Sequence, residues 1–409
     1  MQQYAPRYVA NHPRQAVPQV QSTLAKLSLC RTAALGGRTL RCESCDHRCV
    51  VYNSCGDRHC PQCRGARRAE WMESTRDLLL PEVDYFQVVF TLPAELSALA
   101  LGNRWPLYNL LFTAAWQALR EVIKEACGFE AAALMVLHTW NQRLDHHPHV
   151  HALVPGGGPS LLGNRWIKSR HPRHRRRGKP YLVDNRQLSA RFRQLFIRGV
   201  TKLHRQGMLR LGSSAATSCT GDSLVELLTR LASRDWVVYI EAPPHESASA
   251  EQVLKYLARY MAGGPISDRR LVSHNAGKVS FLARSRDKPT DGGRAKQIPV
   301  TLRGDAFVRR WCLHILPKNF TKVRRFGGYT NRHCQSYLNR CRELLGLTDG
   351  PPSADCPDVT LPEETGEFET SPTRCPHCRS QLVCLAQTDR PSWSLVMASG
   401  DRPLWYRDG

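Results

Sequence analysis

The chain lacks long apolar runs, and this absence excludes several classes of protein. No segment approaches the roughly 20 consecutive apolar residues that a membrane-spanning helix needs, and residues 1–13 contain no apolar stretch like that of a secretory signal. There is no internal repeat and no Gly-x-x-x-x-Gly-Lys-Ser/Thr loop for the phosphates of a nucleoside triphosphate. We therefore expect a cytoplasmic protein, with no membrane partner, whose chemistry needs no ATP.

Acidic residues are scarce relative to basic ones. The 409 residues include 58 Lys and Arg against 35 Asp and Glu, which gives a net charge of +23. Such an excess favours a polyanionic partner, and nucleic acid is the commonest one, although a basic surface can also serve solubility alone. The length exceeds that of a usual single domain, so two or three units are expected.

Composition divides the chain into three segments. Residues 1–80 hold most of the clustered cysteines, and residues 81–346 show the apolar periodicity of a larger folded domain, including a basic insertion at about 160–180. Residues 347–409 form a tail, in which residues 349–373 carry seven acidic and no basic side chains. This composition predicts a linker between the large domain and the end of the chain.

Two Cys-x-x-Cys pairs in the first segment predict a zinc site. Cys42 with Cys45 and Cys60 with Cys63 are separated by fourteen residues, and two such tight turns supply the four thiolates of a tetrahedral zinc shell. In a reducing cytoplasm, clustered cysteines indicate metal rather than disulfides. Four nearby residues could form a second zinc site: Cys30, Cys49, Cys55 and His59. The alternative is that some of them are ordinary small residues of a core. A module with so few apolar residues is expected to need its metal to fold.

A further pair lies near the end of the chain. Cys375 and Cys378 supply only half of a zinc shell, so they form a weaker candidate site. Cys356 or Cys384 could complete it.

Two histidines spaced i, i+2 form the most informative pattern. Residues 85–92, 132–142 and 149–154 read as strands, the last two joined by a turn, and residues 106–127 as an amphipathic helix. Because side chains alternate along a strand, His149 and His151 share one face while Val150, Ala152 and Val154 face a core. Two imidazoles leave a divalent ion under-coordinated. Gln142, an oxygen donor suited to Mg²⁺ or Mn²⁺, or alternatively His138, is predicted to be the third ligand.

A tyrosine pair supplies a candidate nucleophile. Tyr256 and Tyr260 are four residues apart in a predicted helix, so they project from one face at the edge of its apolar stripe. Edge tyrosines are commonly part of a core rim, and a phenol of ordinary pKa, about 10, is a poor nucleophile. Beside a metal-bound phosphate the phenol becomes an acceptable one, and its ester conserves the energy of the broken phosphodiester.

Basic residues near these sites are candidates for DNA contacts. Residues 318–342 interleave seven Lys and Arg with aromatic rings, a pattern suited to the phosphates and unpaired bases of single-stranded DNA, although a basic helix face with buried rings would look similar. The individual candidates are Arg58, Arg64 and Arg67 beside the cysteine pairs, Arg259 between the tyrosines, and Arg324 and Arg325 in the basic segment.

Together these motifs resemble the HUH endonuclease superfamily, and more closely its insertion-sequence-ninety-one family of bacterial rolling-circle transposases, relatives of the Helitrons. The resemblance covers residues 30–345. It is carried by Cys30-Arg31-Thr32, Asn53-Ser54-Cys55, Arg58-His59-Cys60-Pro61-x-Cys63, Val89-Phe90-Thr91-Leu92-Pro93, His138-Thr139-Trp140, residues 147–158, Tyr256-Leu257-x-Arg259-Tyr260, His314-x-Leu316-Pro317 and Asn331-Arg332.

The resemblance implies an α+β fold, in which a central antiparallel sheet like that of ferredoxin or an RNA-recognition module is flanked by helices, beside a small N-terminal zinc-binding domain. It implies metal ligation by His149 and His151 and nucleophilic attack by Tyr256 and Tyr260. One tyrosine would form a 5′-phosphotyrosine at the end of the transposon and free a 3′-hydroxyl, and the other would act on the second end or the target. The implied partners are single-stranded DNA and a host helicase or replication machinery, at the bacterial nucleoid.

Two other functions stay open at this point. A plasmid rolling-circle initiator or a relaxase would use the same chemistry, although relaxases often carry a helicase that this sequence does not show. A non-catalytic zinc protein that binds DNA as a regulator could keep the same fold. The intact histidines and both tyrosines argue against the regulator.

Overall fold

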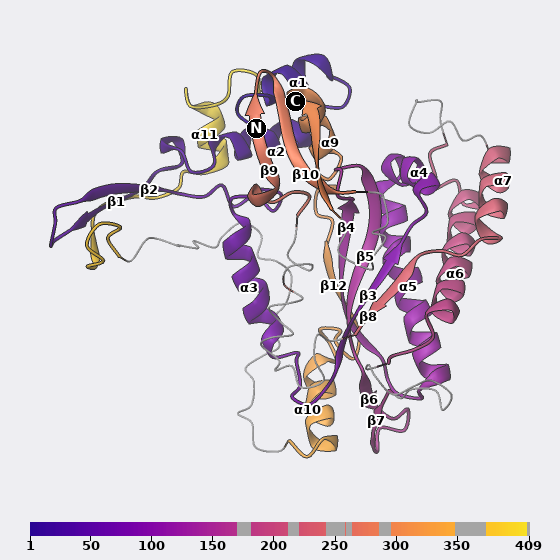
Figure 1. Ribbon diagram of the computed structural model, residues 1–409. Helices are drawn as coiled ribbons and strands as arrows, with labels where there is room; N and C mark the ends of the chain where they lie inside the picture. The colour runs from indigo at the N-terminus through magenta and orange to yellow at the C-terminus, as the bar shows by residue number, and fades with distance from the viewer. Residues whose placement is uncertain are drawn as a thin grey trace.

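A five-stranded antiparallel sheet lies at the centre of the molecule, in the order β12-β4-β5-β3-β8 (Figure 1). This computed structural model describes residues 1–169, 181–211, 221–242, 258, 264–285, 296–347 and 374–406. The central strands are β3 (Tyr85–Thr91), β4 (Ala132–Trp140), β5 (His146–Pro155), β8 (Val238–Glu241) and β12 (Val323–Gly327). The predicted α+β class, with an antiparallel sheet flanked by helices, is confirmed.

One face of the sheet packs against helices. These are α4 (Ser97–Gly102), α5 (Arg104–Ala126) and α6 (Asn185–Arg205), while α7 (Gly221–Ala232) packs on the outer side of α6. Val150, Ala152 and Val154 of β5 are fully buried against them, as the alternation predicts. Each of the two valine side chains contributes about 1.5–3 kcal/mol on burial. The helical layer therefore fixes which face of β5 turns away from the core.

The opposite face carries a second apolar cluster and the histidines. Helices α3 (Arg64–Arg76) and α10 (Cys334–Leu344) lie on this side. Trp71 and Leu338 of these helices join Leu134, Val136 and Leu153 of the sheet in one buried cluster. His138, His149 and His151 follow the same alternation as these sheet residues, so they share this face, which we call the histidine face.

The N-terminal helices pack against elements from late in the chain. Helices α1 (Ala5–Asn11) and α2 (Pro18–Leu29) share a buried cluster with α9 (Gly304–Cys312) and the sheet of β9 (Leu271–Asn275), β10 (Lys278–Arg284) and β11 (Gln297–Arg303). The late elements thus complete a core that begins at residue 4.

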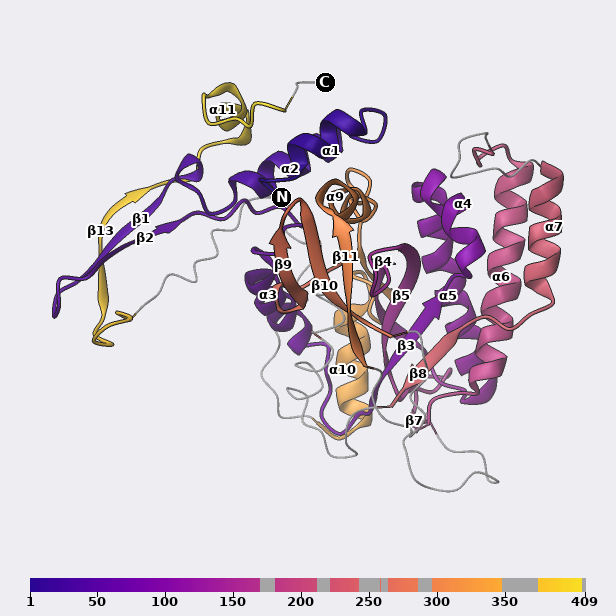
Figure 2. The ribbon, with the colours of Figure 1, turned by 45° about the horizontal axis from the view of Figure 1, so that its top comes forward.

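A three-stranded sheet projects from this unit, in the order β13-β1-β2 (Figure 2). It joins β1 (Gly37–Cys42) and β2 (Arg48–Tyr52) to β13 (Leu382–Thr388), and we call these strands with their turns the arm. The short helix α11 (Trp393–Ala398) follows β13 and buries Val396 in the cluster of α1 and α2. The described part of the predicted tail, residues 374–406, thus contributes β13 and α11 to the N-terminal unit.

Two short strands extend the end of the central sheet. These are β6 (Gly157–Pro159) and β7 (Trp166–Lys168), which pair with each other, and β7 lies within the predicted basic insertion at about 160–180. Residues 170–180 of that insertion lie outside the described residues. Within the part of the chain that the structure describes, no helix is long and apolar enough to cross a membrane.

Candidate metal centres and catalytic face

Three imidazoles converge on the histidine face. His138 of β4 lies directly opposite His149 of β5 in the strand register, and His151 follows two residues later on the same side. One nitrogen from each ring lies within 4.8 Å of the other two. The ring centroid of His151 is 4.5 Å from that of His138 and 5.0 Å from that of His149. Three nitrogens this close can ligate one divalent cation.

The protonation of these rings suits metal binding. Burial lowers the pKa of His149 to about 4, and burial together with nearby positive charge lowers the pKa of His151 well below its ordinary value. Both rings are therefore neutral at pH 7. Nδ1–H of His149 donates to the carbonyl of His147, 2.8 Å away, which leaves Nε2 of His149 as the ligand atom.

Gln87 of β3 holds the third ring of the group. Its Nε2 lies 2.8 Å from Nδ1 of His151, and both side chains are buried. The Oε1 atom of Gln87 is buried without a hydrogen-bond partner among the described residues. Turning the amide by half a turn lets Oε1 accept from Nδ1–H, which again leaves Nε2 of His151 for a cation. The donor set and this orphaned oxygen fit a metal site.

The sequence missed Gln87 as a site residue. The available signal was one amide within an otherwise apolar buried strand. Lys322 was also not singled out. Its Nζ lies 5.3 Å from the centroid of Trp140, and its charge contributes to the lowered pKa of His151.

The two candidates for the third ligand have different positions. His138 lies in the group of imidazoles, at the end of a regular strand. Gln142 lies beyond the end of β4, in the turn toward β5, and its backbone carbonyl accepts a hydrogen bond from Arg270. The geometry favours His138.

The predicted nucleophiles, Tyr256 and Tyr260, lie outside the described residues. Ala258 between them is described. It is helical, 1% exposed, and belongs to the cluster that Leu134, Val136 and Leu153 form on the histidine face. Ala258 therefore lies on the same face of the sheet as the three imidazoles.

The predicted DNA-binding arginines occupy different environments. Arg58 donates to the carbonyls of Pro317 and Phe320, so it joins the loop that carries Cys55 and Cys60 to the segment before β12. Arg324 packs over the rings of Phe112 and Phe320, and burial lowers its pKa. Arg325 pairs with Leu134 in the register and so lies on the histidine face. Arg64 and Arg67 lie on α3, but their side chains, like the whole of Arg259, are outside the described residues.

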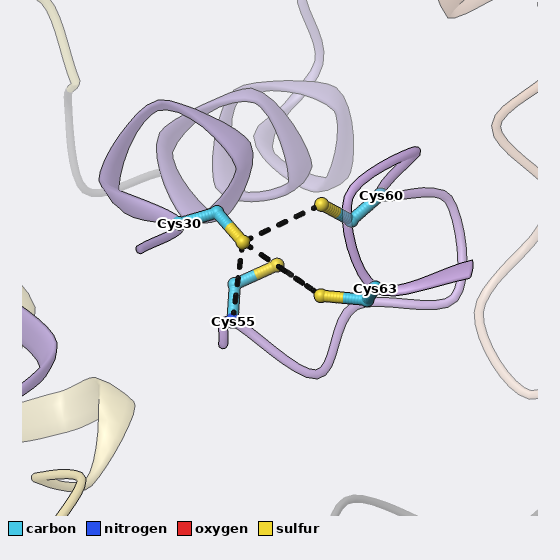
Figure 3. Close-up of side chains that lie close together, drawn as sticks. All are labelled: Cys30, Cys55, Cys60 and Cys63. Atoms are coloured by element: carbon cyan, nitrogen blue, oxygen red, sulfur yellow. Dashed lines mark hydrogen bonds between the residues drawn. The ribbon is translucent and has the colours of Figure 1, made fainter. Parts of the chain in front are cut away.

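Four cysteines converge between α2 and α3 (Figure 3). Cys30 follows α2 and Cys63 precedes α3, while Cys55 and Cys60 come from the loop between β2 and α3. Sulfur–sulfur distances are 3.6 Å for Cys30 to Cys60, 3.7 Å for Cys30 to Cys63 and 3.6 Å for Cys55 to Cys63. A tetrahedral zinc ion with bonds of about 2.3 Å separates its sulfurs by about 3.8 Å. This group fits structural zinc.

A second group takes half of its cysteines from each end of the chain. Cys42 and Cys45 meet Cys375 and Cys378, with the four sulfurs within 4.8 Å of one another. The prediction that Cys42 and Cys45 share one zinc with Cys60 and Cys63 is therefore wrong. The two early pairs diverge because β1 and β2 carry the first pair out along the arm.

Three further metal candidates that the structure describes lie in neither group. Cys49 packs beside the small core of the arm, and Cys384 is exposed on β13. Nδ1 of His59 forms a hydrogen bond with a carboxylate oxygen of Asp57, and Nε2 of His59 accepts a hydrogen bond from the backbone N–H of Leu316. Cys356 lies outside the described residues.

Comparisons with known proteins agree with this arrangement. Residues 132–337 match the family model described as "Putative transposase", and residues 1–92 match the model described as "Transposase zinc-binding domain". The first match spans the histidine face from β4 to α10, and the second spans the Cys30–Cys63 group. No solved structure matches the chain.

Two curated relatives cover most of the sequence. The chain is 39% identical over 391 residues to "Putative transposase y4qJ" of Sinorhizobium fredii, covering 93% of this chain and 92% of the relative. It is 28% identical over 369 residues to "Transposase for insertion sequence element IS801" of Pseudomonas savastanoi pv. phaseolicola, covering 89% and 83%.

Proposed function

The chain belongs to the insertion-sequence-ninety-one family of transposases, and from this premise we propose that it cuts and rejoins single-stranded DNA through a tyrosine ester, in rolling-circle transposition. Its substrates are then the ends of its transposon and the target DNA. The single observation that carries the proposal is the convergence of His138, His149 and His151 on one face of the sheet.

The three imidazoles supply one half of the proposed chemistry. His138, His149 and His151 would hold Mg²⁺ or Mn²⁺, which when bound withdraws charge from a phosphate oxygen. Gln87 and the carbonyl of His147 would keep the Nδ1 side of two rings occupied, so that each Nε2 faces the cation.

The tyrosines supply the other half. In an ideal α-helix, Tyr256 and Tyr260 lie about 160° around the axis from Ala258. On one side of the helix, the apolar stripe lies between Ala258 and the pair of tyrosines. If this stripe packs on the sheet, Ala258 occupies one flank of the helix and the tyrosines the other. The proposal requires the tyrosine flank to face the imidazoles.

The bonds broken and formed in cleavage and rejoining balance, so the reaction needs no external energy source. The phenol oxygen of one tyrosine forms a bond to phosphorus as the bond to the 3′ oxygen breaks, and the phenol proton passes to that oxygen. The products are a 5′-phosphotyrosine and a 3′-hydroxyl. Attack of a 3′-hydroxyl on the tyrosine ester reverses these bond changes and joins two strands. Strand separation is left to a helicase of the host.

A covalent adduct with a single-stranded oligonucleotide tests the proposal. The wild-type chain with Mn²⁺ should give a protein band shifted by the mass of the cleaved oligonucleotide, and the double variant Tyr256→Phe/Tyr260→Phe should give none. Tyr52→Phe, on the exposed face of the arm, is the matched control and should keep the adduct. An undiminished adduct in the double variant would show that the nucleophile lies elsewhere.

A further inference from the structure

We propose that Cys42, Cys45, Cys375 and Cys378 bind a second structural zinc ion that locks the two ends of the chain together in the arm. Sγ of Cys42 lies 3.3 Å from Sγ of Cys378, and Sγ of Cys45 lies 3.5 Å from Sγ of Cys375. All four sulfurs fall within the spread that one tetrahedral ion requires. The site goes beyond the proposed function, and half of its ligands lie outside the matched zinc-binding domain.

The two halves of this site have the same backbone geometry. In the first turn the N–H of Cys42 donates to the carbonyl of His47, and the N–H of Asp46 donates to the carbonyl of Cys42. In the second turn the N–H of Cys375 donates to Ser380, and the N–H of Arg379 donates to Cys375, at the same sequence spacings.

The backbone dihedrals repeat this equivalence. The residue after the second cysteine of each pair has a positive φ, 57° at Asp46 and 65° at Arg379. Such a conformation is uncommon away from glycine, so its occurrence at the same place in both turns indicates a shared constraint. Two equivalent turns that present their thiols to one point are what a four-cysteine zinc site requires.

Strand pairing and a ring contact bring the turns together. Cys42 lies opposite Leu382 in the register of β1 and β13, which sets both turns at the same end of the arm. The rings of His47 and His377, one from each turn, lie with centroids 4.4 Å apart.

The apolar core of the arm is too small to stabilise its three strands. Its buried cluster consists of Leu40, Cys42, Cys375 and Leu382, and two of these are proposed ligands. Of the seven residues of β13 only Leu382 is buried, whereas Leu385 is half exposed. Three short strands with such a core are not stable in water, so a metal supplies what burial does not.

A pair of disulfides explains the geometry less well. The closest sulfurs are 3.3 Å and 3.5 Å apart, whereas a disulfide bond is about 2.05 Å long. The equivalent turns also place all four sulfurs around one point rather than in two separate pairs.

Zinc content of the full chain tests the site. Wild-type protein purified under reducing conditions should contain two zinc ions per chain by elemental analysis, one for each four-cysteine group. Cys375→Ser/Cys378→Ser should lose one ion and keep the other. The matched control is Cys49→Ser/Cys384→Ser, which removes two cysteines of the same arm that lie outside the group and should keep both ions.

Hydrogen exchange of β1, β2 and β13 provides the second measurement. In Cys375→Ser/Cys378→Ser these strands should exchange much faster, while β4 and β5 keep their protection. One zinc ion in the wild type, or an unchanged zinc content in Cys375→Ser/Cys378→Ser, would overturn the proposal. Four thiols that resist alkylation until a reductant is added, with only one zinc present, would show disulfides instead.

Discussion

The imidazole of His138 meets that of His149 across the pair of strands β4 and β5, edge to face, with ring centroids 5.4 Å apart. This relationship follows from the register, because residues directly opposite each other in an antiparallel pair share a face. It makes His138 the better candidate for the third ligand, and Gln142 the poorer one.

Substitution of these two residues should separate the candidates. His138→Ala should weaken Mn²⁺ binding by more than tenfold, because two imidazoles alone leave the ion under-coordinated. Gln142→Ala should leave the affinity within about twofold of the wild type. Isothermal titration of each variant with Mn²⁺ measures this, and the reverse ranking would identify Gln142 as the ligand.

Gln87→Leu should lower the affinity for Mn²⁺ by about 10–100-fold, the usual cost of losing a hydrogen bond that orients a metal-ligating histidine. Gln87→Glu should recover most of this loss, because a carboxylate can accept from Nδ1–H of His151. Thr91→Val, on the same face of β3, serves as the control. Equal losses in Gln87→Leu and Gln87→Glu would argue against an orienting role.

Stability should fall as the pH drops below about 6.5, because buried histidines, among them His146 and His314, stay neutral in the fold. Burial lowers the pKa of His146 and of His314 to about 3 in each case. Between pH 6.5 and about 3 the unfolded chain binds protons that the folded chain does not, so the free energy of unfolding decreases. The slope is about 1.4 kcal/mol per pH unit for each such histidine.

Urea unfolding at several pH values between 5 and 7 measures this slope. His314→Gln should flatten it by the contribution of one histidine, whatever its effect on stability at pH 7. The exposed His333→Gln should leave the slope unchanged. A slope that His314→Gln does not alter would show that this ring is protonated in the fold.

Substitution of the neighbours Arg325 and Arg324 should affect different properties, namely DNA binding for Arg325 and stability for Arg324. Arg325→Ala should weaken binding to single-stranded DNA and reduce the slope of log affinity against log salt by about 0.7, the value for one phosphate contact on a single strand. Arg324→Ala should lower the melting temperature instead, since its guanidinium packs over Phe112 and Phe320. Salt titrations of fluorescence anisotropy distinguish these outcomes, and equal salt slopes for the two variants would refute the assignment.

Local periodicity made the strands and their faces predictable. Alternation placed Val150, Ala152 and Val154 in the helical core and His149 on the other face, and the structure agrees. The same alternation separates Arg324 from Arg325, but only once the pairing of β12 with β4 is known. From the sequence alone, both arginines are predicted to bind DNA, whereas the strand register places their side chains on opposite faces of the sheet.

The grouping of cysteines was not predictable in the same way. Spacing identifies a Cys-x-x-Cys turn, but it does not determine which other turn completes the shell. Cys42 lies 18 residues from Cys60 in the sequence, yet its sulfur meets that of Cys378, 336 residues away. Sequence proximity favoured the wrong partner because the arm carries Cys42 away from the first group.

The group of Cys42, Cys45, Cys375 and Cys378 cannot assemble until nearly the whole chain has been synthesised. At a translation rate of about 5–20 residues per second, Cys378 emerges roughly 17–67 s after Cys42. Once Cys63 has emerged, and for the rest of that interval, the nascent chain contains Cys42 and Cys45 together with the complete set formed by Cys30, Cys55, Cys60 and Cys63. If both groups bind zinc, correct loading of a new molecule requires the earlier set to bind its ion before the thiols of Cys42 and Cys45 can compete for it.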